Sequence, residues 1–217
     1  MKYSNQNSHN KVIFITGTPG TGKTSLANFL KEKFSDNYIS KIIKISELAI
    51  QNDMIEGIDS DKGYKIVNIS KLDKKINEEI ENFMLNNLIL DSSSNDINNI
   101  KSNNKKYFKL LIVEGHLSHL CNCKNVDKII VLRLNPKILE KRLKSRSYSE
   151  NKINENLEAE ALGVCSAEAY QNYADHLNEI DTSDLSINEV ASIVESIIFD
   201  EKSFPVGKID FMDWFLF

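Results

Sequence analysis

Arginine is scarce in this sequence, and so are the residues that fix unusual backbone or covalent structure. The 217 residues include 27 lysines and arginines, and only Arg133, Arg142 and Arg146 are arginines. There are three prolines, three cysteines and one tryptophan. We attribute the lysine excess to biased nucleotide composition of the genome. An arginine kept against such a bias is therefore a candidate functional residue.

Other absences exclude whole classes of protein. Three cysteines, Cys121, Cys123 and Cys165, make no disulfide framework, and their odd number favours a reducing, cytoplasmic setting. The longest apolar runs have about six residues, whereas a membrane-spanning helix needs roughly 20. The first ten residues lack the apolar core of a signal peptide. A net charge of -4 argues against broad binding of nucleic-acid phosphates.

What is present predicts one globular α/β domain over residues 1–217. Hydrophobic residues make up 41% and charged residues 27%, and this length supports a single sizeable core. Near-continuous apolar runs at 11–16, 107–115 and 128–134 are typical of buried parallel strands. Their alternation with helical periodicity predicts a three-layer α/β/α fold around a central parallel sheet. Further predicted elements are a helix from 23, a strand at 38–46, helices at 47–51, 69–88, 135–144, 149–162 and 166–177, a strand at 179–183 and a last helix from 186.

Three segments do not fit this alternation. Residues 52–65 are polar and punctuated by glycine, so we expect an excursion outside the core. Residues 91–106, DSSSNDINNIKSNNKK, are a low-complexity tract that predicts a disordered surface insertion. The C-terminal tail, 200–217, holds the tryptophan and several apolar residues. It either docks against the domain or binds a partner.

The strongest motif is GTPGTGKT at 17–24, which matches G-x-x-x-x-G-K-[ST] between a predicted strand and a predicted helix. Glycines let backbone N–H groups turn toward phosphates, and the helix N-terminus adds positive potential. Lys23 would reach the β- and γ-phosphates, and the Thr24 hydroxyl would bind Mg²⁺. Gly20 shapes the loop and Ser25 adds a hydroxyl. The absence of an N-K-x-D motif weighs against a GTPase.

A second motif, LLIVEGHLSHL, ends the next central strand. Glu114 at the carboxyl end of that strand would hold Mg²⁺ through water or orient an attacking group. His116 follows at the same edge, and beside a magnesium–nucleotide site we favour a functional role over a structural one. His119 and the cysteines at 121 and 123 add zinc-like chemistry, but their spacing is too compressed for an ordinary zinc site.

Together with a third stretch, these motifs resemble a known family. GTPGTGKTS, VEGHLSHL and RSYSENKINENLEAE are similar to the adenylate kinase isoenzyme 6-like (CINAP) family in its archaeal form. The resemblance runs from about Lys11 to Ile198, excluding the insertion. It implies a nucleoside monophosphate kinase with ATPase activity, which takes part in late maturation of the small ribosomal subunit and its rRNA. The implied ligands are ATP, Mg²⁺ and AMP or another nucleoside monophosphate, and the implied partner is a platform protein of the small subunit.

The resemblance also implies roles for individual positions. The acidic-x-His motif of the family falls on Glu114 and His116, and its histidine is associated with hydrolysis. Arg146 falls on an arginine of the lid, about 145–155, that contacts ATP. The family has Arg-Gly-Tyr there, whereas this chain has Arg146-Ser147-Tyr148, which puts the hinge freedom of the lid in doubt. The monophosphate-binding segment spans about 43–67, and the ATP-binding loop residues are Gly20, Gly22, Lys23, Thr24 and Ser25.

The arginine distribution bears on the acceptor. Residues 35–75 contain no arginine, so a monophosphate would rely on Lys62, Lys65 or backbone donors. Lysine cannot form a planar bidentate clamp, so we expect weak acceptor binding and competition between AMP and water. Arg142 and Arg146 would share a helix face if the helix extends that far.

Arg133 ends a buried strand near the nucleotide, and solvated surface charge is the alternative role for Arg142. Two other functions stay open at this point. One is an ATP-driven assembly switch on a small-subunit ribosomal protein, with little kinase turnover. The other is a P-loop kinase for another small metabolite, since small kinases of this type share the same plan.

Overall fold

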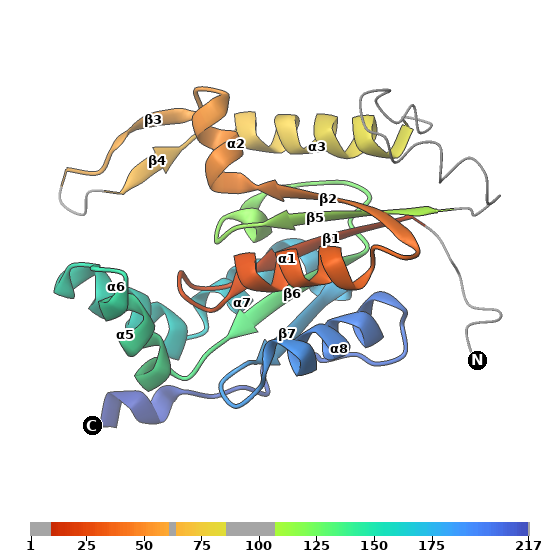
Figure 1. Cartoon of the computed structure of the whole chain (residues 1–217). Coiled ribbons are helices and arrows are strands. Elements are labelled where there is room, and N and C mark those ends of the chain that lie inside the picture. Colours follow the sequence, from red (N-terminus) through yellow and green to blue (C-terminus); the bar gives the residue numbers. More distant parts are fainter. Residues whose placement is uncertain (1–9, 61–63, 86–106, 217) are drawn as a thin grey trace.

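The centre of the molecule is a parallel sheet of five strands in the order β2-β5-β1-β6-β7 (Figure 1). The computed structural model describes residues 10–60, 64–85 and 107–216. The middle strands are buried on both faces, which explains why their sequences are continuously apolar. The predicted fold class is therefore confirmed. The strands are β1 (Lys11–Thr16), β2 (Tyr38–Lys44), β5 (Phe108–Glu114), β6 (Lys128–Arg133) and β7 (Leu177–Asp181).

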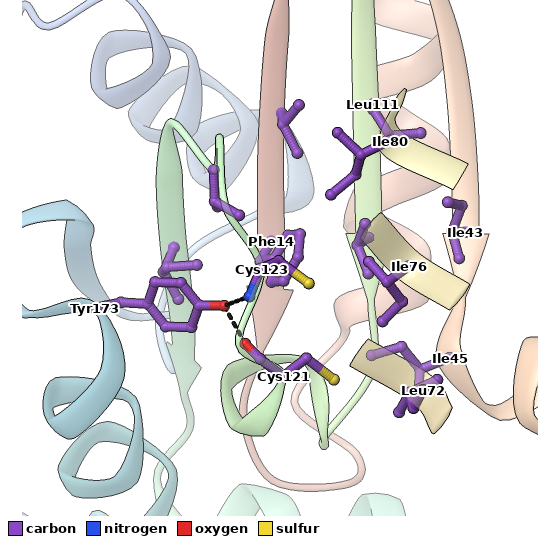
Figure 2. Packing of buried hydrophobic residues seen from close by; sticks show 14 of the residues in the cluster. Phe14, Ile43, Ile45, Leu72, Ile76, Ile80, Leu111, Cys121, Cys123 and Tyr173 are labelled. Carbon is purple, nitrogen blue, oxygen red and sulfur yellow. Dashed lines mark hydrogen bonds between the residues drawn. The ribbon is translucent and has the colours of Figure 1, made fainter. Parts of the chain in front are cut away.

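Helices cover both faces of the sheet and complete the three layers. On one face, α1 (Lys23–Lys33) and α8 (Ile187–Ile198) pack their apolar sides against alternate strand residues. On the other face, α2 (Ile45–Gln51), α3 (Ile69–Leu85) and α7 (Val164–Tyr173) enclose a second core. Figure 2 shows the buried residues of α3 lined up along this core, with Ile80 beside Leu111. The helical spacing of the apolar residues in α3 is what allows one face of it to be buried. The residues are Leu72, Ile76 and Ile80.

Cys121 and Cys123 belong to this second core. The Tyr173 hydroxyl accepts a hydrogen bond from the backbone N–H of Cys123 at 3.0 Å and donates one to the carbonyl of Cys121 (Figure 2). Burial raises the pKa of the Cys123 thiol to about 12, so the thiol stays protonated at neutral pH. Within the described ranges no group of three potential ligands is placed to hold a metal ion.

Two helix starts follow their sequence signals. Asn135 accepts a hydrogen bond from the N–H of Lys137 at 2.9 Å and precedes Pro136, the first residue of α5 (Pro136–Ser145). Ser186 and Glu189 form a reciprocal capping box at the start of α8. Both predicted helix starts are therefore confirmed.

Several predicted boundaries were wrong. The first predicted helix after β2 begins at Ile45, and the last strand ends at Asp181 rather than at residue 183. The two predicted helices that follow α5 are α6 (Glu150–Ala161) and α7, which ends at Tyr173 because a short 3₁₀ turn, Ala174–His176, leads into β7. Such shifts arise because tertiary contacts, rather than local propensity, end these elements. Other short 3₁₀ turns are Ser118–Leu120 and Met212–Leu216.

The polar segment that was expected as an excursion lies outside the main sheet, but it is paired. β3 (Ile55–Ile58) and β4 (Lys65–Val67) form an antiparallel hairpin. We call residues 55–60 and 64–67 the acceptor hairpin, because they fall within or at the end of the segment, about 43–67, that was predicted to bind the monophosphate. The predicted insertion at 91–106 lies outside the described residues. Along the described parts of the chain, no helix has both the length and the apolar character needed to cross a membrane.

The C-terminal tail follows the edge of the sheet. The N–H of Glu179 in β7 donates to the carbonyl of Phe204 at 2.8 Å, and the N–H of Phe204 donates to Asn178 Oδ1 at 2.9 Å. Trp214 packs against the small core between α5 and α6. The structure thus favours docking, although Phe215 and Leu216 remain exposed.

Candidate nucleotide-binding site

The loop between β1 and α1 has a backbone that requires glycine. Gly17 and Gly20 have φ of 129° and 101°, in the left-handed region that side chains rarely adopt. A Cβ on Gly17 would lie 2.4 Å from the carbonyl oxygen of Leu132, and one on Gly20 would lie 2.7 Å from Leu139 Cδ1. The loop is therefore held against β6 and α5, with its N–H groups at the start of α1. This is the arrangement that binds phosphate.

Lys23 lies inside this loop and is buried. Its Nζ donates hydrogen bonds to the carbonyls of Gly17 at 2.8 Å and Thr18 at 2.9 Å. Burial, aided by the charge of Arg146 and opposed by Cys165, Glu114 and Glu160, lowers the pKa of Lys23 to about 8. The ammonium is thus held at the centre of the loop, and its charge is lost at a lower pH than that of an exposed lysine.

This pKa predicts a pH dependence for ATP binding. Only the protonated ammonium attracts phosphate, so the affinity for ATP is expected to fall as the pH rises through about 8. The dissociation constant, measured by calorimetry between pH 6.5 and 9.5, should rise roughly tenfold per pH unit above that point. Lys31→Met, on the exposed side of α1, should keep the same profile. A dissociation constant that stays flat to pH 9.5 would contradict the lowered pKa.

Thr24 and Glu114 meet at the carboxyl end of the sheet. The Thr24 hydroxyl donates to Glu114 Oε1 at 2.9 Å, and Glu114 is buried. They meet because β5 pairs with β1 in the register Ile15 to Glu114, which places the end of β5 beside the phosphate loop. A hydroxyl and a carboxylate side by side are oxygen ligands of the kind that Mg²⁺ prefers, so these residues fit the predicted metal.

His116 lies in the turn after β5 and is an exposed residue. Desolvation by the surrounding protein, with repulsion from the Lys23 ammonium, lowers the pKa of His116 to about 4. The imidazole is therefore neutral at pH 7 and is available to accept a hydrogen bond or a proton.

His119, by contrast, is fully enclosed. Its Nδ1 lies 2.6 Å from Thr16 Oγ1, and its Nε2 lies 2.9 Å from Glu168 Oε2. These contacts fasten the turn after β5 to β1 and α7. His119 is thus a structural residue that fixes the segment carrying His116.

Arg142 lies within α5, whereas Arg146 follows the last residue of that helix. α5 ends at Ser145, one residue before Arg146, so the condition for a shared helix face is not met. Arg142 Nη1 donates to the carbonyl of Gly20 at 3.3 Å, which places it at the phosphate loop. Arg146 caps the helix, is exposed, and acts electrostatically on Lys23. The guanidinium of Arg142 thus lies at the phosphate loop, and Arg146 follows the end of the helix that carries it.

Ser147 occupies the position where the Arg-Gly-Tyr pattern has glycine. Its φ is 57°, in the left-handed region where glycine has no steric cost. The chain keeps this backbone conformation although it has a side chain at the position. The turn between α5 and α6 is therefore retained, at a cost of about 1 kcal/mol.

Arg133 ends a buried strand, as predicted, and its guanidinium is engaged in a buried cluster beside the phosphate loop. It is 3% exposed, and its guanidinium donates to Glu160 Oε1 at 2.8 Å and to Glu179 Oε1 at 2.6 Å. The Thr18 hydroxyl donates to the other carboxylate oxygen of Glu160. The buried cluster of Thr18, Arg133, Glu160 and Glu179 therefore ties the phosphate loop to α6 and β7.

Sequence analysis missed Glu160 and Thr18. A signal for Glu160 was present, because helical spacing places it on the same face as Ile153 and Leu157. A carboxylate on an apolar helix face needs a buried cation. No comparable signal marked Thr18, whose partner comes from 142 residues away.

Comparison of the sequence with known proteins places this chain in a family. A family model described as "AAA domain" matches residues 13–163. A protein named "Putative adenylate kinase" from Methanothermobacter thermautotrophicus is 37% identical over 205 residues, which cover 94% of this chain and 99% of that protein. The chain belongs to this archaeal family. A protein of the same name from Archaeoglobus fulgidus is also 37% identical over 205 residues, with 93% and 92% covered.

A solved structure agrees on the fold. The shikimate kinase from Acinetobacter baumannii, in complex with shikimate, aligns with a TM-score of 0.53 at 14% identity, covering 89% of this chain and 95% of that one. At this identity the likeness shows the fold alone, which is that of a P-loop kinase. In the present protein the predicted site residues lie around one end of the central sheet, and their individual roles stay predictions. These residues are Lys23, Thr24, Ser25, Glu114, His116 and Arg146.

Proposed function

We propose that the protein is a nucleoside monophosphate kinase that transfers the γ-phosphoryl group of ATP to AMP, with transfer to water as a competing reaction. The observation that carries the proposal is the hydrogen bond from Thr24 to Glu114 beside a buried Lys23. The Lys23 ammonium and the oxygen atoms of Thr24 and Glu114 thus lie together at the N-terminus of α1, where they could bind a phosphate and its metal ion. The name shared by the archaeal relatives supports AMP as the acceptor.

Each residue has a defined task in this proposal. Backbone N–H groups of the loop and the Lys23 ammonium hold the β- and γ-phosphates. Thr24 and Glu114 would hold Mg²⁺, which neutralises phosphate charge when bound. Arg146 would face the transferring group, where positive charge has its largest effect. The neutral His116 would orient a water molecule or take its proton.

The acceptor side has fewer cations than the donor side. The acceptor hairpin and α2 carry no arginine, and Lys65 in β4 is exposed. A monophosphate held there by single-point charges is bound less firmly than one in a bidentate clamp. We therefore expect a high KM for AMP and measurable hydrolysis of ATP in its absence.

A second candidate function is an ATP-driven assembly switch acting on a small-subunit ribosomal protein in the cytoplasm, during late maturation of that subunit and its rRNA. The observation that favours it is the exposed apolar end of the tail, Phe215 and Leu216, next to the docked Trp214. A partner bound there would contact α6, which carries Glu160. In this case hydrolysis would depend on the partner and AMP would be a poor substrate.

The two functions are separated by measuring products with and without AMP. Two ADP formed per ATP consumed in the presence of AMP supports the kinase. His116→Ala should lower hydrolysis by about 100-fold or more while the dissociation constant for ATP changes less than about twofold. His176→Ala, in the 3₁₀ turn before β7, is the control and should behave like wild type. Hydrolysis that rises only with a ribosomal partner, with no AMP-dependent ADP, would contradict the kinase assignment.

A further inference from the structure

The acceptor hairpin touches helix α6 through a small set of polar and aromatic contacts. The Tyr64 hydroxyl, directly before β4, donates a hydrogen bond to Glu155 Oε2 at 2.5 Å. These residues are 91 positions apart in the sequence. In Figure 1 the hairpin and α6 project on the same side of the molecule. The hydrogen bond thus joins two segments that are distant along the chain.

Lys152 strengthens the same contact. Its Nζ lies 4.7 Å from the ring centroid of Tyr64 and 4.7 Å from that of Tyr148. A lysine between two aromatic faces is attracted to both rings. Lys152 and Glu155 are three residues apart in α6, so they lie on one face of the helix and reach Tyr64 together.

Both sides of the contact are anchored. On the hairpin, the N–H of Asp59 donates to the carbonyl of Tyr64 at 2.8 Å, which fixes the backbone that carries the ring. On the other side, Tyr148 packs against the apolar core between α5 and α6. Because each partner is held by its own element, the contact fixes the distance between the elements.

The helix on the other side of the contact also supports the phosphate loop. Glu160 in α6 accepts a hydrogen bond from the Thr18 hydroxyl of that loop. The contact therefore joins the acceptor hairpin to the helix that holds the phosphate loop. A hairpin held against α6 in this way would exclude water from the space beside the loop and align an acceptor with ATP.

We propose that Tyr64, Lys152 and Glu155 are positioning residues that hold the acceptor hairpin against α6 and so favour phosphoryl transfer to a nucleoside monophosphate over transfer to water. The inference rests on the proposed kinase function and adds what sets the balance between the two acceptors. It also accounts for how a segment without arginine can present an acceptor, since closure compensates for weak binding of its phosphate.

The test uses two variants that keep side-chain bulk, Tyr64→Phe and Lys152→Met. In each, the ratio of AMP-dependent ADP formation to AMP-independent phosphate release is expected to fall by about 5- to 20-fold, as lost hydrogen bonds to charged groups and cation–π contacts do elsewhere. KM for AMP should rise, and KM for ATP should stay within about twofold. Tyr170→Phe and Lys141→Met, both on exposed helix faces, are the matched controls and should keep the wild-type ratio.

Hydrogen exchange measures the contact without relying on catalysis. Amides of residues 55–60 and 64–67 should exchange faster in Tyr64→Phe than in wild type, while amides of β1 should be unchanged. If wild type forms ADP with AMP but both variants keep its ratio and its exchange rates, the inference is overturned. If wild type forms no AMP-dependent ADP, the proposed function fails instead, whatever the exchange rates show.

Discussion

Replacing Lys23 by methionine is expected to lower ATP turnover, with and without AMP, by about 10²–10³-fold. The side chain is buried within the phosphate loop, and its Nζ already contacts the carbonyls of Gly17 and Thr18. No other lysine in the described part of the chain lies inside this loop, so its charge cannot be replaced locally. Steady-state rates and the ATP dissociation constant should be measured on the same preparations.

Lys31→Met is the matched control, because it removes the same charge from the exposed face of the same helix. It should keep wild-type turnover within about twofold, since exposed charges act weakly through solvent. Wild-type turnover in Lys23→Met would show that the loop does not hold the transferred phosphate, and it would remove the basis of the proposed function.

Replacing Arg133 by methionine is expected to lower the free energy of unfolding by about 3–5 kcal/mol. In the wild type its guanidinium lies between Glu160 and Glu179, and it also donates to the carbonyl of Glu160 at 2.6 Å. The variant leaves two buried carboxylates without their cation, and Thr18 in the phosphate loop depends on one of them. Thermal unfolding should show a Tm lower by on the order of 10 °C.

Arg142→Met provides the control for stability. Arg142 is exposed and its guanidinium donates to the carbonyl of Gly20, so the loss of this side-chain contact should cost less than about 1 kcal/mol. Equal unfolding free energies for the two variants would show that the buried cluster contributes nothing net to folding. A second measurement, ATP affinity of Arg133→Met below its Tm, should fall because the loop loses the support of Glu160.

Much of the fold follows from local sequence patterns. Apolar runs predicted the central strands, helical spacing predicted α3, and cap residues such as Asn135 and Ser186 marked helix starts. These succeeded because burial on both faces and capping are decided by residues close in sequence. The acceptor hairpin was missed, because its strands are short and no apolar alternation marks them.

The residues of the candidate site also divide into those that a local motif predicted and those whose contacts appear only in the folded structure. The phosphate loop motif and the Glu114-x-His116 motif were found because each is contiguous and has a chemical reason for its spacing. The sequence left the role of Arg133 open. Its partners, Glu160 and Glu179, come from other elements, and only the packing of α6 and β7 shows that they neutralise it.

The sequence by itself determined the phosphate loop, the parallel sheet and the family, because glycine placement, apolar runs and contiguous motifs are local properties. Only the tertiary structure decided which charges lie at the phosphate loop and which are buried in the core. It also brought Tyr64 onto α6. Such pairings depend on side chains that are distant along the chain and meet only when the helices pack on the sheet, so no local pattern records them.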